Sequence, residues 1–266
     1  MVNNAGIFLF YKTVTKEIGE MIMTVNGFIK TNQPATKVNG KNTDNRVYHS
    51  ADYDLIGDHH VASSTDTPLR PDAFDKTDAE KMAVIEDKFR EIMETLGLDL
   101  SDDSLRGTPH RVAKMFVREI FSGLNPENKP KMSVFENKFN YGEMLVERNI
   151  SLNSTCEHHF LPIVGKAHVA YVSSGQVIGL SKINRVVDYY ARRPQVQERL
   201  TVQIADELKQ ILKTDDVAVV IDARHMCVSS RGIEDESSST VTAEYSGIFK
   251  DKSSREEFLN YISLSK

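Results

Sequence analysis

The order of hydrophobic periodicities in the C-terminal half constrains the fold of this chain more than any other feature of its sequence. Strand-like alternation in residues 145–151 and 166–172 gives way to helical spacing over 180–213, and strand-like segments return at 217–228 and 239–249. A strand pair, a helix pair and a second strand pair predict an α+β fold. In such a fold, two helices cover one face of an antiparallel sheet.

Two further helices are expected ahead of this unit. The sequence TDAE at 77–80 has the form of a capping box, and apolar residues follow it at helical spacing as far as Gly97. A second helix is expected from an N-cap at Thr108, with proline at its first position, to Gly123. Residues 67–124 are therefore interpreted as an N-terminal helical layer. A capping box at Ser253 and Glu256 predicts one more helix near the C-terminus.

Residues 1–66 are polar and lack sustained periodicity, so we expect a low-complexity, disordered extension. The apolar run 5–11 is too short to span a bilayer and has no basic residue ahead of it, which argues against a membrane anchor or a signal peptide. The chain has only two cysteines, as is typical of a cytoplasmic protein. Its formal net charge of -5 does not indicate a general nucleic-acid binder.

Cys156, His159 and Cys227 are the candidate metal ligands. The first two have C-x-x-H spacing in STCEHHFLP, and Cys227 is expected at the end of a strand that lies beside the first. Zinc favours thiolate and imidazole ligands, whereas magnesium and calcium favour oxygen. Three protein ligands would leave a position open for water, as in catalytic zinc sites. A disulfide between the two cysteines is the alternative.

Two histidines next to these ligands, His158 and His225, are candidates for proton transfer. An open zinc site lowers the pKa of bound water to roughly 7, and attack by that water requires proton carriers nearby. Since neighbouring residues of a strand point to opposite faces, the histidines can reach one substrate only where the backbone departs from a regular strand. The alternative is that they only hydrogen-bond in support of the ligands.

Polar residues suited to a purine nucleotide form the last constellation. Basic residues with helical i, i+3 spacing on a chain of negative net charge predict a polyphosphate site, although solvated helix faces are the alternative. These basic residues, together with one serine, are Arg111, Lys114, Ser181, Lys182, Arg185 and Arg231. A carboxylate such as Glu198 can accept two hydrogen bonds from the edge of a guanine, although a surface glutamate is commoner.

Four segments together resemble GTP cyclohydrolase I: TPHRVAKMF, STCEHHFLPIVGKAHVAY, VIGLSKINRVVDYYARRPQVQERLT and HMCVSSRG. The resemblance extends from Thr67 to the C-terminus. It implies the tunnelling fold, with a catalytic domain over 125–266 and one Zn²⁺ per subunit held by Cys156, His159 and Cys227, and no organic cofactor. It also implies that zinc-activated water attacks carbon 8 of GTP. This carbon leaves as formate, and rearrangement of the ribose and ring closure give 7,8-dihydroneopterin triphosphate, in the first step of tetrahydrofolate biosynthesis.

The resemblance also implies roles for individual residues. The catalytic residues would be His158, His225, Glu157 and Ser181. Guanine would be anchored by Glu198, and the remaining contacts to the substrate would come from Gln197, Arg111, Lys114, Lys182, Arg185 and Arg231. Family members assemble as decamers of two pentamers, with active sites shared between subunits. The segments GLSKINR and ARRPQVQERL are more similar to the bacterial, folate-making branch than to the animal branch.

Two other functions remain compatible with these motifs. A nitrile reductase of deazaguanine metabolism shares the tunnelling fold but uses a cysteine nucleophile and NADPH, which the C-x-x-H spacing with a distant cysteine disfavours. A non-catalytic, zinc-stabilised purine or pterin binder would keep the three ligands but would need neither His158 nor His225.

Overall fold

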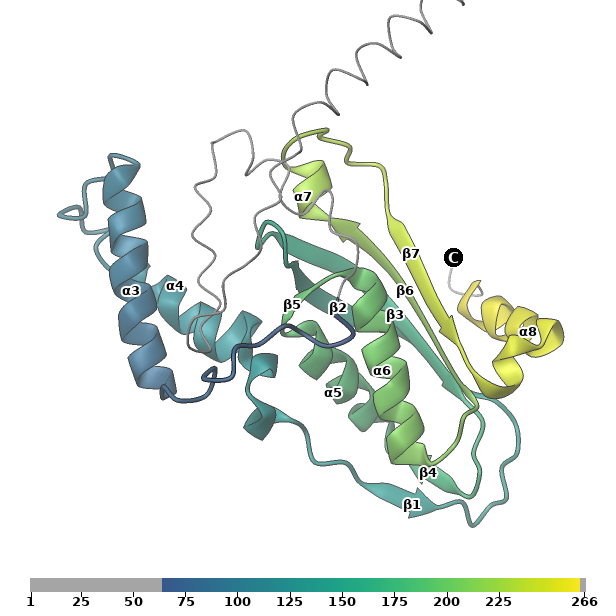
Figure 1. The fold of residues 1–266 in the computed structure, drawn as a ribbon. Helices are drawn as coiled ribbons and strands as arrows, with labels where there is room; N and C mark the ends of the chain where they lie inside the picture. The colour runs from purple at the N-terminus through teal and green to yellow at the C-terminus, as the bar shows by residue number, and fades with distance from the viewer. Residues whose placement is uncertain (1–63, 264–266) are drawn as a thin grey trace, which may run out of the picture. The chain divides into compact units, whose positions relative to one another are not determined.

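The computed structural model describes residues 64–263, so the disorder expected for the N-terminal extension lies almost wholly outside the described residues. Five strands form one sheet in the order β5-β2-β3-β6-β7 (Figure 1). Their bounds are Pro194–Gln195 (β5), Leu145–Cys156 (β2), Pro162–Tyr171 (β3), Val217–His225 (β6) and Thr240–Tyr245 (β7). The two-residue β5 runs parallel to β2, and all other neighbours pair antiparallel. The predicted antiparallel sheet is confirmed.

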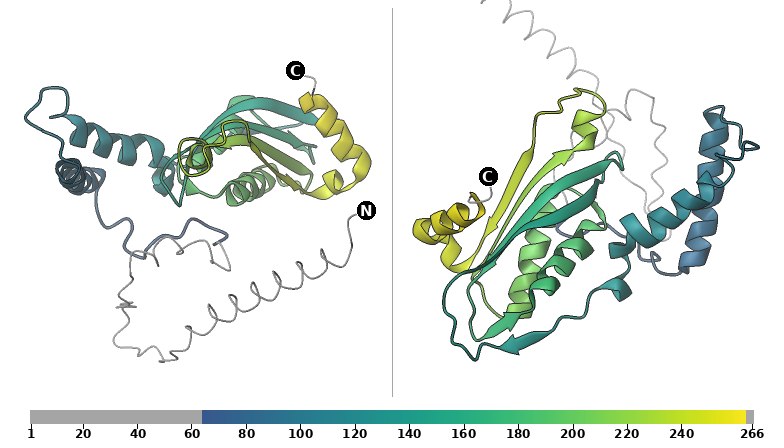
Figure 2. Two further views of the ribbon diagram at one scale, coloured as in Figure 1. Left: turned by 90° about the horizontal axis from the view of Figure 1, so that it is seen from above. Right: turned by 180° about the vertical axis from the view of Figure 1, so that it is seen from behind.

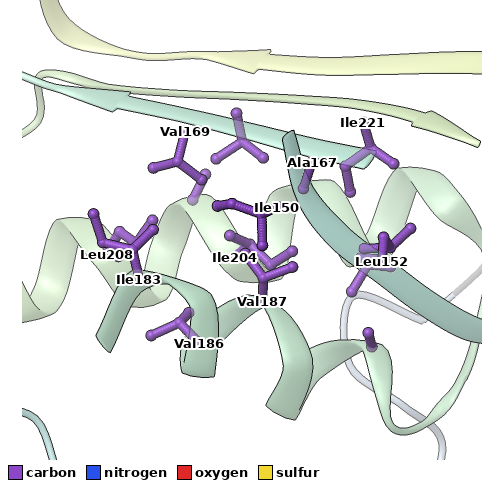
Figure 3. Close-up of a cluster of buried hydrophobic side chains, with 14 of the residues drawn as sticks. Ile150, Leu152, Ala167, Val169, Ile183, Val186, Val187, Ile204, Leu208 and Ile221 are labelled. Atoms are coloured by element: carbon purple, nitrogen blue, oxygen red, sulfur yellow. The ribbon is translucent and has the colours of Figure 1, made fainter. Parts of the chain in front are cut away.

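Two helices, α5 (Leu180–Ala191) and α6 (Gln197–Leu212), lie on the same face of this sheet (Figures 1 and 2). Figure 3 shows the core between them, where Ile183 and Val187 of α5 and Ile204 of α6 lie beneath the strands. Each of these side chains is fully buried. Helical spacing of apolar residues therefore places both helices on the sheet, as the sequence predicts.

The opposite face is partly covered by the C-terminal helix α8 (Lys252–Ser263). Adjacent residues of β3 point to opposite faces, so Val169 belongs to the core under α5 and α6 while Ala170 packs in a cluster with Phe249 and Phe258. The predicted capping box is wrong, because Ser253 already lies inside the first turn of α8.

The N-terminal helical layer consists of α3 (Asp78–Thr95) and α4 (Thr108–Met115). The capping box of α3 is confirmed, since the amide of Glu80 donates to the Thr77 hydroxyl (3.3 Å) and the amide of Thr77 donates to the Glu80 carboxylate (2.7 Å). The N-cap of α4 is Gly107, one residue before the predicted Thr108.

The predicted continuation of α4 to Gly123 is not a regular α-helix. A π-helical turn, η1 (Phe116–Ile120), follows α4 and leads into the 3-10 turn η2 (Ser122–Leu124). In η2 the amide of Gly123 donates to the carbonyl oxygen of Arg192 (3.0 Å). A Cβ atom on Gly123 would lie 2.1 Å from the carbonyl oxygen of Tyr189, so only glycine allows this contact between the helical layer and α5.

Short elements that the sequence did not predict complete the described chain. The strands β1 (Val134–Glu136) and β4 (Gln176–Ile178) pair antiparallel in a separate two-stranded sheet. Two 3-10 turns, η3 (Pro126–Asn128) and η4 (Gly247–Lys250), precede β1 and α8 respectively. None of the helices between residues 64 and 263 has the length and apolar character needed to cross a membrane.

Candidate metal centre and substrate site

Pairing with β3 brings the ends of two distant strands together. Thr155 near the end of β2 pairs with Pro162, and His225 at the end of β6 pairs with Ile163. Both strands therefore end at the same end of the sheet, one on each side of β3. The expectation that they lie directly beside each other is wrong, because β3 separates them.

The three candidate ligands meet at this end of the sheet. Cys156 is the last residue of β2, His159 lies in the turn after it, and Cys227 lies in the four-residue helix α7 (Met226–Ser229) that follows β6. Their ligand atoms all lie within 4.8 Å of one another. Cys227 is therefore not at a strand end, as the sequence suggested, but in the first turn of the helix that follows the strand. Both cysteines are free, so the alternative of a disulfide is wrong.

A tight turn presents Cys156 and His159 on the same side. The amide of Phe160 donates to the carbonyl oxygen of Cys156 (2.9 Å), and the amide of Cys156 donates to that of Leu161 (2.8 Å). Phe160 adopts a left-handed conformation with φ 51°, which reverses the chain within a few residues. His158 consequently lies in a turn and not in a regular strand, as its proposed role requires.

The donor set of this cluster suits a thiophilic divalent cation. Burial, followed by the neighbouring Cys156, raises the pKa of the Cys227 thiol to about 11. Two adjacent thiols, one buried and the other partly buried, lose their protons only when a cation compensates the negative charge of the thiolates, and a bound metal ion would provide that cation. Two sulfur ligands and one imidazole fit zinc, and the three of them leave a coordination position open.

Both candidate proton carriers lie beside this cluster. Nδ1 of His158 is 3.8 Å from Sγ of Cys156. Burial lowers the pKa of His225 below its usual value, while the negative charge of Glu198 acts in the opposite direction. His225 is therefore mainly neutral at pH 7, and Glu198, at the start of α6, is close enough to influence it.

Gln197, predicted to bind substrate, is buried and bonded to the protein. Its Nε2 donates to the carbonyl oxygens of Ile221 (3.2 Å) and Thr240 (2.8 Å) and to the hydroxyl of Thr242 (3.1 Å). These three acceptors orient the amide so that Oε1 faces Nε2 of His225 at 2.8 Å. The predicted contact between Gln197 and substrate stays a prediction.

Glu157 and Arg231 also lie at the turn of residues 156–160, which carries two of the candidate ligands and is called the metal turn below. Both oxygens of Glu157 accept hydrogen bonds from the buried guanidinium of Arg199, at 2.6 and 3.3 Å. Nη1 of Arg231 lies 2.8 Å from Nε2 of His159. Arg199 was not singled out as a functional residue from the sequence. Its place next to Leu200, near the apolar side of a predicted helix, was a signal that this charged residue is buried and paired.

The remaining predicted residues lie elsewhere in the described chain. Ser181 and Lys182 are in the first turn of α5, and Arg185 borders a cavity of about 190 Å³ with Arg192. The Arg111 guanidinium bonds to the carbonyl oxygen of Ser104 and the hydroxyl of Thr108. Between residues 64 and 263, no hydrogen bond or ion pair joins these side chains or Lys114 to the three metal-site residues. Glu198 borders a second cavity, of about 520 Å³.

Several known proteins are similar in sequence to most of this chain. The family model described as GTP cyclohydrolase I matches residues 85–263. A protein named "GTP cyclohydrolase 1" from Flavobacterium johnsoniae is 64% identical over 211 residues, which cover 79% of this chain and 95% of that protein. Proteins of the same name from Citrobacter koseri and Salmonella arizonae are 52% identical over 209 residues, or 78% of this chain and 94% of theirs. The helix-covered antiparallel sheet agrees with the tunnelling fold, and with matches of this extent the chain belongs to the GTP cyclohydrolase I family.

Proposed function

We propose that this protein is a GTP cyclohydrolase I. It opens the imidazole ring of GTP by hydrolysis, releases carbon 8 as formate and, after rearrangement of the ribose and ring closure, gives 7,8-dihydroneopterin triphosphate. The observation that carries the proposal is the meeting of Cys156, His159 and Cys227 within 4.8 Å, with two histidines beside them. Family membership supports the identity of the substrate.

Zinc is the proposed metal, one ion per subunit, and no organic cofactor takes part. Cys156, His159 and Cys227 would hold it. When bound, zinc would supply Lewis acidity and lower the pKa of a water molecule to near neutrality. The exposed His159 and the buried Cys156 indicate that the cluster opens to solvent on one side, where a substrate can approach.

His225 and His158 are the proposed proton carriers. Since Nε2 of a neutral His225 donates to Oε1 of Gln197, Nδ1 is left as the basic atom that can take a proton. The exposed His158 follows the buried end of β2, with Nδ1 3.8 Å from Sγ of Cys156, so it would approach a bound substrate from the Cys156 side. Glu157 and Ser181 are the other residues for which the family resemblance suggests catalytic roles.

Substrate binding is assigned to residues from several elements. Glu198 would accept hydrogen bonds from guanine next to His225, and Gln197 would help to position the purine. The triphosphate and ribose would be bound by basic residues from the helices and the loop after α7, namely Arg111, Lys114, Lys182, Arg185 and Arg231.

An assembled homo-oligomer, a decamer of two pentamers, is part of this proposal. Arg111, on α4, is bonded within its own helical layer and makes no direct bond to the metal residues of the same chain in the described part, which is consistent with an active site shared between subunits. Exposed apolar residues on α3, Val84 and Ile92, and at its C-cap, Leu96, support packing of this helix against a partner.

We further propose the division of the chain and its place in the cell. Residues 1–66 would form an extension, 67–124 the helical layer and 125–266 the catalytic domain. The enzyme would act in the cytoplasm, in the folate-making branch, without binding nucleic acid or membrane.

The test is to incubate the full-length protein with GTP and to measure formate and, after oxidation, pterin fluorescence. We expect equal amounts of both products, their loss after complete chelation and their return with added zinc. No product, or product unaffected by zinc removal, would overturn the proposal. Stoichiometric nucleotide binding without turnover would instead identify a non-catalytic binder, and NADPH consumption with a nitrile would identify a reductase.

A further inference from the structure

Arg199 is a buried cation in the first turn of α6, and two of its three guanidinium nitrogens donate to Glu157 in the metal turn. Only 5% of the residue is exposed. A buried guanidinium is tolerated only when it is paired and hydrogen-bonded, and here two partners provide this. Nη1 and Nη2 donate to the two oxygens of Glu157 (2.6 and 3.3 Å), and Nε donates to the carbonyl oxygen of Ser64 (2.8 Å).

Glu157 lies between the ligand Cys156 and His158, so its position fixes the course of the turn. Besides the two bonds to its carboxylate, its amide donates to the carbonyl oxygen of Gln195 in β5 (3.0 Å). The turn is therefore held from its backbone side by β5 and from its side-chain side by α6. Cys227, the third ligand, comes from α7 and is not part of this arrangement.

The geometry of the pair makes it directional. A guanidinium that bonds both oxygens of a carboxylate fixes its plane as well as its distance, which a lysine at the same position would not do. The bond from Nε to Ser64 fixes the remaining edge of the guanidinium, so the guanidinium cannot rotate away from Glu157 without losing this partly buried hydrogen bond.

We propose that Arg199 is a positioning residue that, through Glu157, holds the turn from Cys156 to His159 in its metal-binding conformation. This inference rests on the metal site of the proposed function and deepens it. It also gives Glu157 a positioning role in place of the direct catalytic role that the family resemblance suggests, because both of its oxygens already accept hydrogen bonds from Arg199.

The test measures zinc affinity of the full-length protein by competition with a chromogenic chelator, together with thermal unfolding of the metal-free protein. Arg199→Lys keeps the charge but loses the fork, and Glu157→Gln keeps the shape but loses the charge. We expect each to weaken zinc binding by roughly tenfold to a hundredfold, the range for residues that orient metal ligands. The double variant should be little weaker than either single variant, because both act through the same contact.

Matched controls come from α5, where Arg192 and Asp188 form an arginine–carboxylate pair (3.0 Å) away from the metal turn. Arg192→Lys and Asp188→Asn should leave zinc affinity unchanged. A purely structural role for Arg199 would lower the unfolding temperature of the metal-free protein without changing the zinc affinity of the folded fraction, and that result would overturn the inference. Should Arg199→Lys fail to fold, Glu157→Gln, at a partly exposed side chain, decides the question.

Failure of the inference is distinguishable from failure of the proposed function. Zinc binding by the wild type that is lost in Cys227→Ser but unchanged in Arg199→Lys and Glu157→Gln would overturn only the positioning role. Absence of zinc binding by the wild type would overturn both.

Discussion

Oε1 of Gln197, in the first turn of α6, lies 2.8 Å from Nε2 of His225, at the end of β6. Because Nε2 of Gln197 is occupied by acceptors on β6 and β7, the amide has one available orientation, and His225 must be the donor in this pair. The tautomer of His225, and with it the proposed catalytic use of this residue, thus depends on Gln197, which is 1% exposed.

Gln197→Ala should reduce turnover more than it changes the KM for GTP. The substitution removes the hydrogen bonds that Gln197 donates to the buried carbonyl oxygen of Ile221 and to Thr240 and Thr242, at a cost of about 1–3 kcal/mol, and frees His225 to change tautomer. Steady-state kinetics and chemical denaturation measure the two effects. Gln210→Ala, at an exposed position of the same helix, is the control and should alter neither quantity. An unchanged kcat in Gln197→Ala would show that this amide does not govern His225.

Cys227→Ser should lose zinc and activity while remaining folded. The hydroxyl of serine is a poor zinc ligand, and Cys227 is only half-buried in a short helix at the surface end of the sheet. Metal analysis, circular dichroism and the formate assay give the three readouts. Met226→Leu, at the adjacent position, should retain all three properties. Full activity in Cys227→Ser would refute the assignment of this ligand.

His168→Gln should make stability less sensitive to acid. His168 is 8% exposed, accepts a hydrogen bond from the amide of Asn149 (3.4 Å), and burial lowers its pKa below 6.5. Between that lowered pKa and 6.5 the unfolded chain binds more protons than the folded one. The contribution of neutral His168 to the free energy of unfolding is therefore fully present above about pH 6.5 and is lost as the pH decreases toward the lowered pKa. Asp222 opposes this pKa shift, whereas Arg148 and Lys166 add to it.

The measurement for this variant is the unfolding temperature of the metal-free protein between pH 5 and 7. His168→Gln should have a shallower pH slope than the wild type, without a flat profile, because the pKa of His225 is lowered as well. Gln210→Ala, at an exposed and non-titrating position of α6, should retain the wild-type slope. Identical slopes in all three proteins would contradict the prediction.

Gly165→Ala should destabilise the sheet near the metal centre. A Cβ atom at this position in β3 would lie 2.1 Å from the carbonyl oxygen of Asp222 and 2.5 Å from Cα of Ala223 in β6, so the strands would have to separate. We expect a loss of about 1–3 kcal/mol or more in the free energy of unfolding, measured by denaturant titration. Gly142→Ala, which meets nothing within 4 Å, is the matched control and should be nearly neutral.

Periodicity predicted the sheet and the two helices that cover it, because each of these elements buries one continuous apolar stripe, and the capping box together with helical spacing predicted α3. The stripe of α6 is an example, with Leu200, Ile204, Leu208 and Leu212 at most 1% exposed. The C-x-x-H spacing similarly predicted a pair of ligands close in sequence. The sequence did not predict features that depend on local backbone geometry. Examples are the π-helical turn after Met115 and the short helix that carries Cys227.

Long-range contacts of polar side chains were beyond prediction for a related reason. Arg199 is buried because Glu157 and Ser64 meet it from two other parts of the chain. Neither partner can be read from the helix pattern around Arg199, which identifies only the buried side of α6. The same holds for Gln197, whose four partners come from β6 and β7.

The pairing of β3 with both neighbours has a consequence for how the chain tolerates changes in length. The start of β3 sets the relative positions of the candidate ligands, because Pro162 pairs with Thr155, next to Cys156, and Ile163 pairs with His225, two residues before Cys227. Residues inserted between Cys156 and Pro162 would therefore alter the ligand geometry directly. Residues inserted at Gly175 would lengthen the turn between β3 and β4, which follows the opposite end of β3 from Pro162 and Ile163. Insertions and tags should accordingly be accepted at that end of the molecule and rejected at the other.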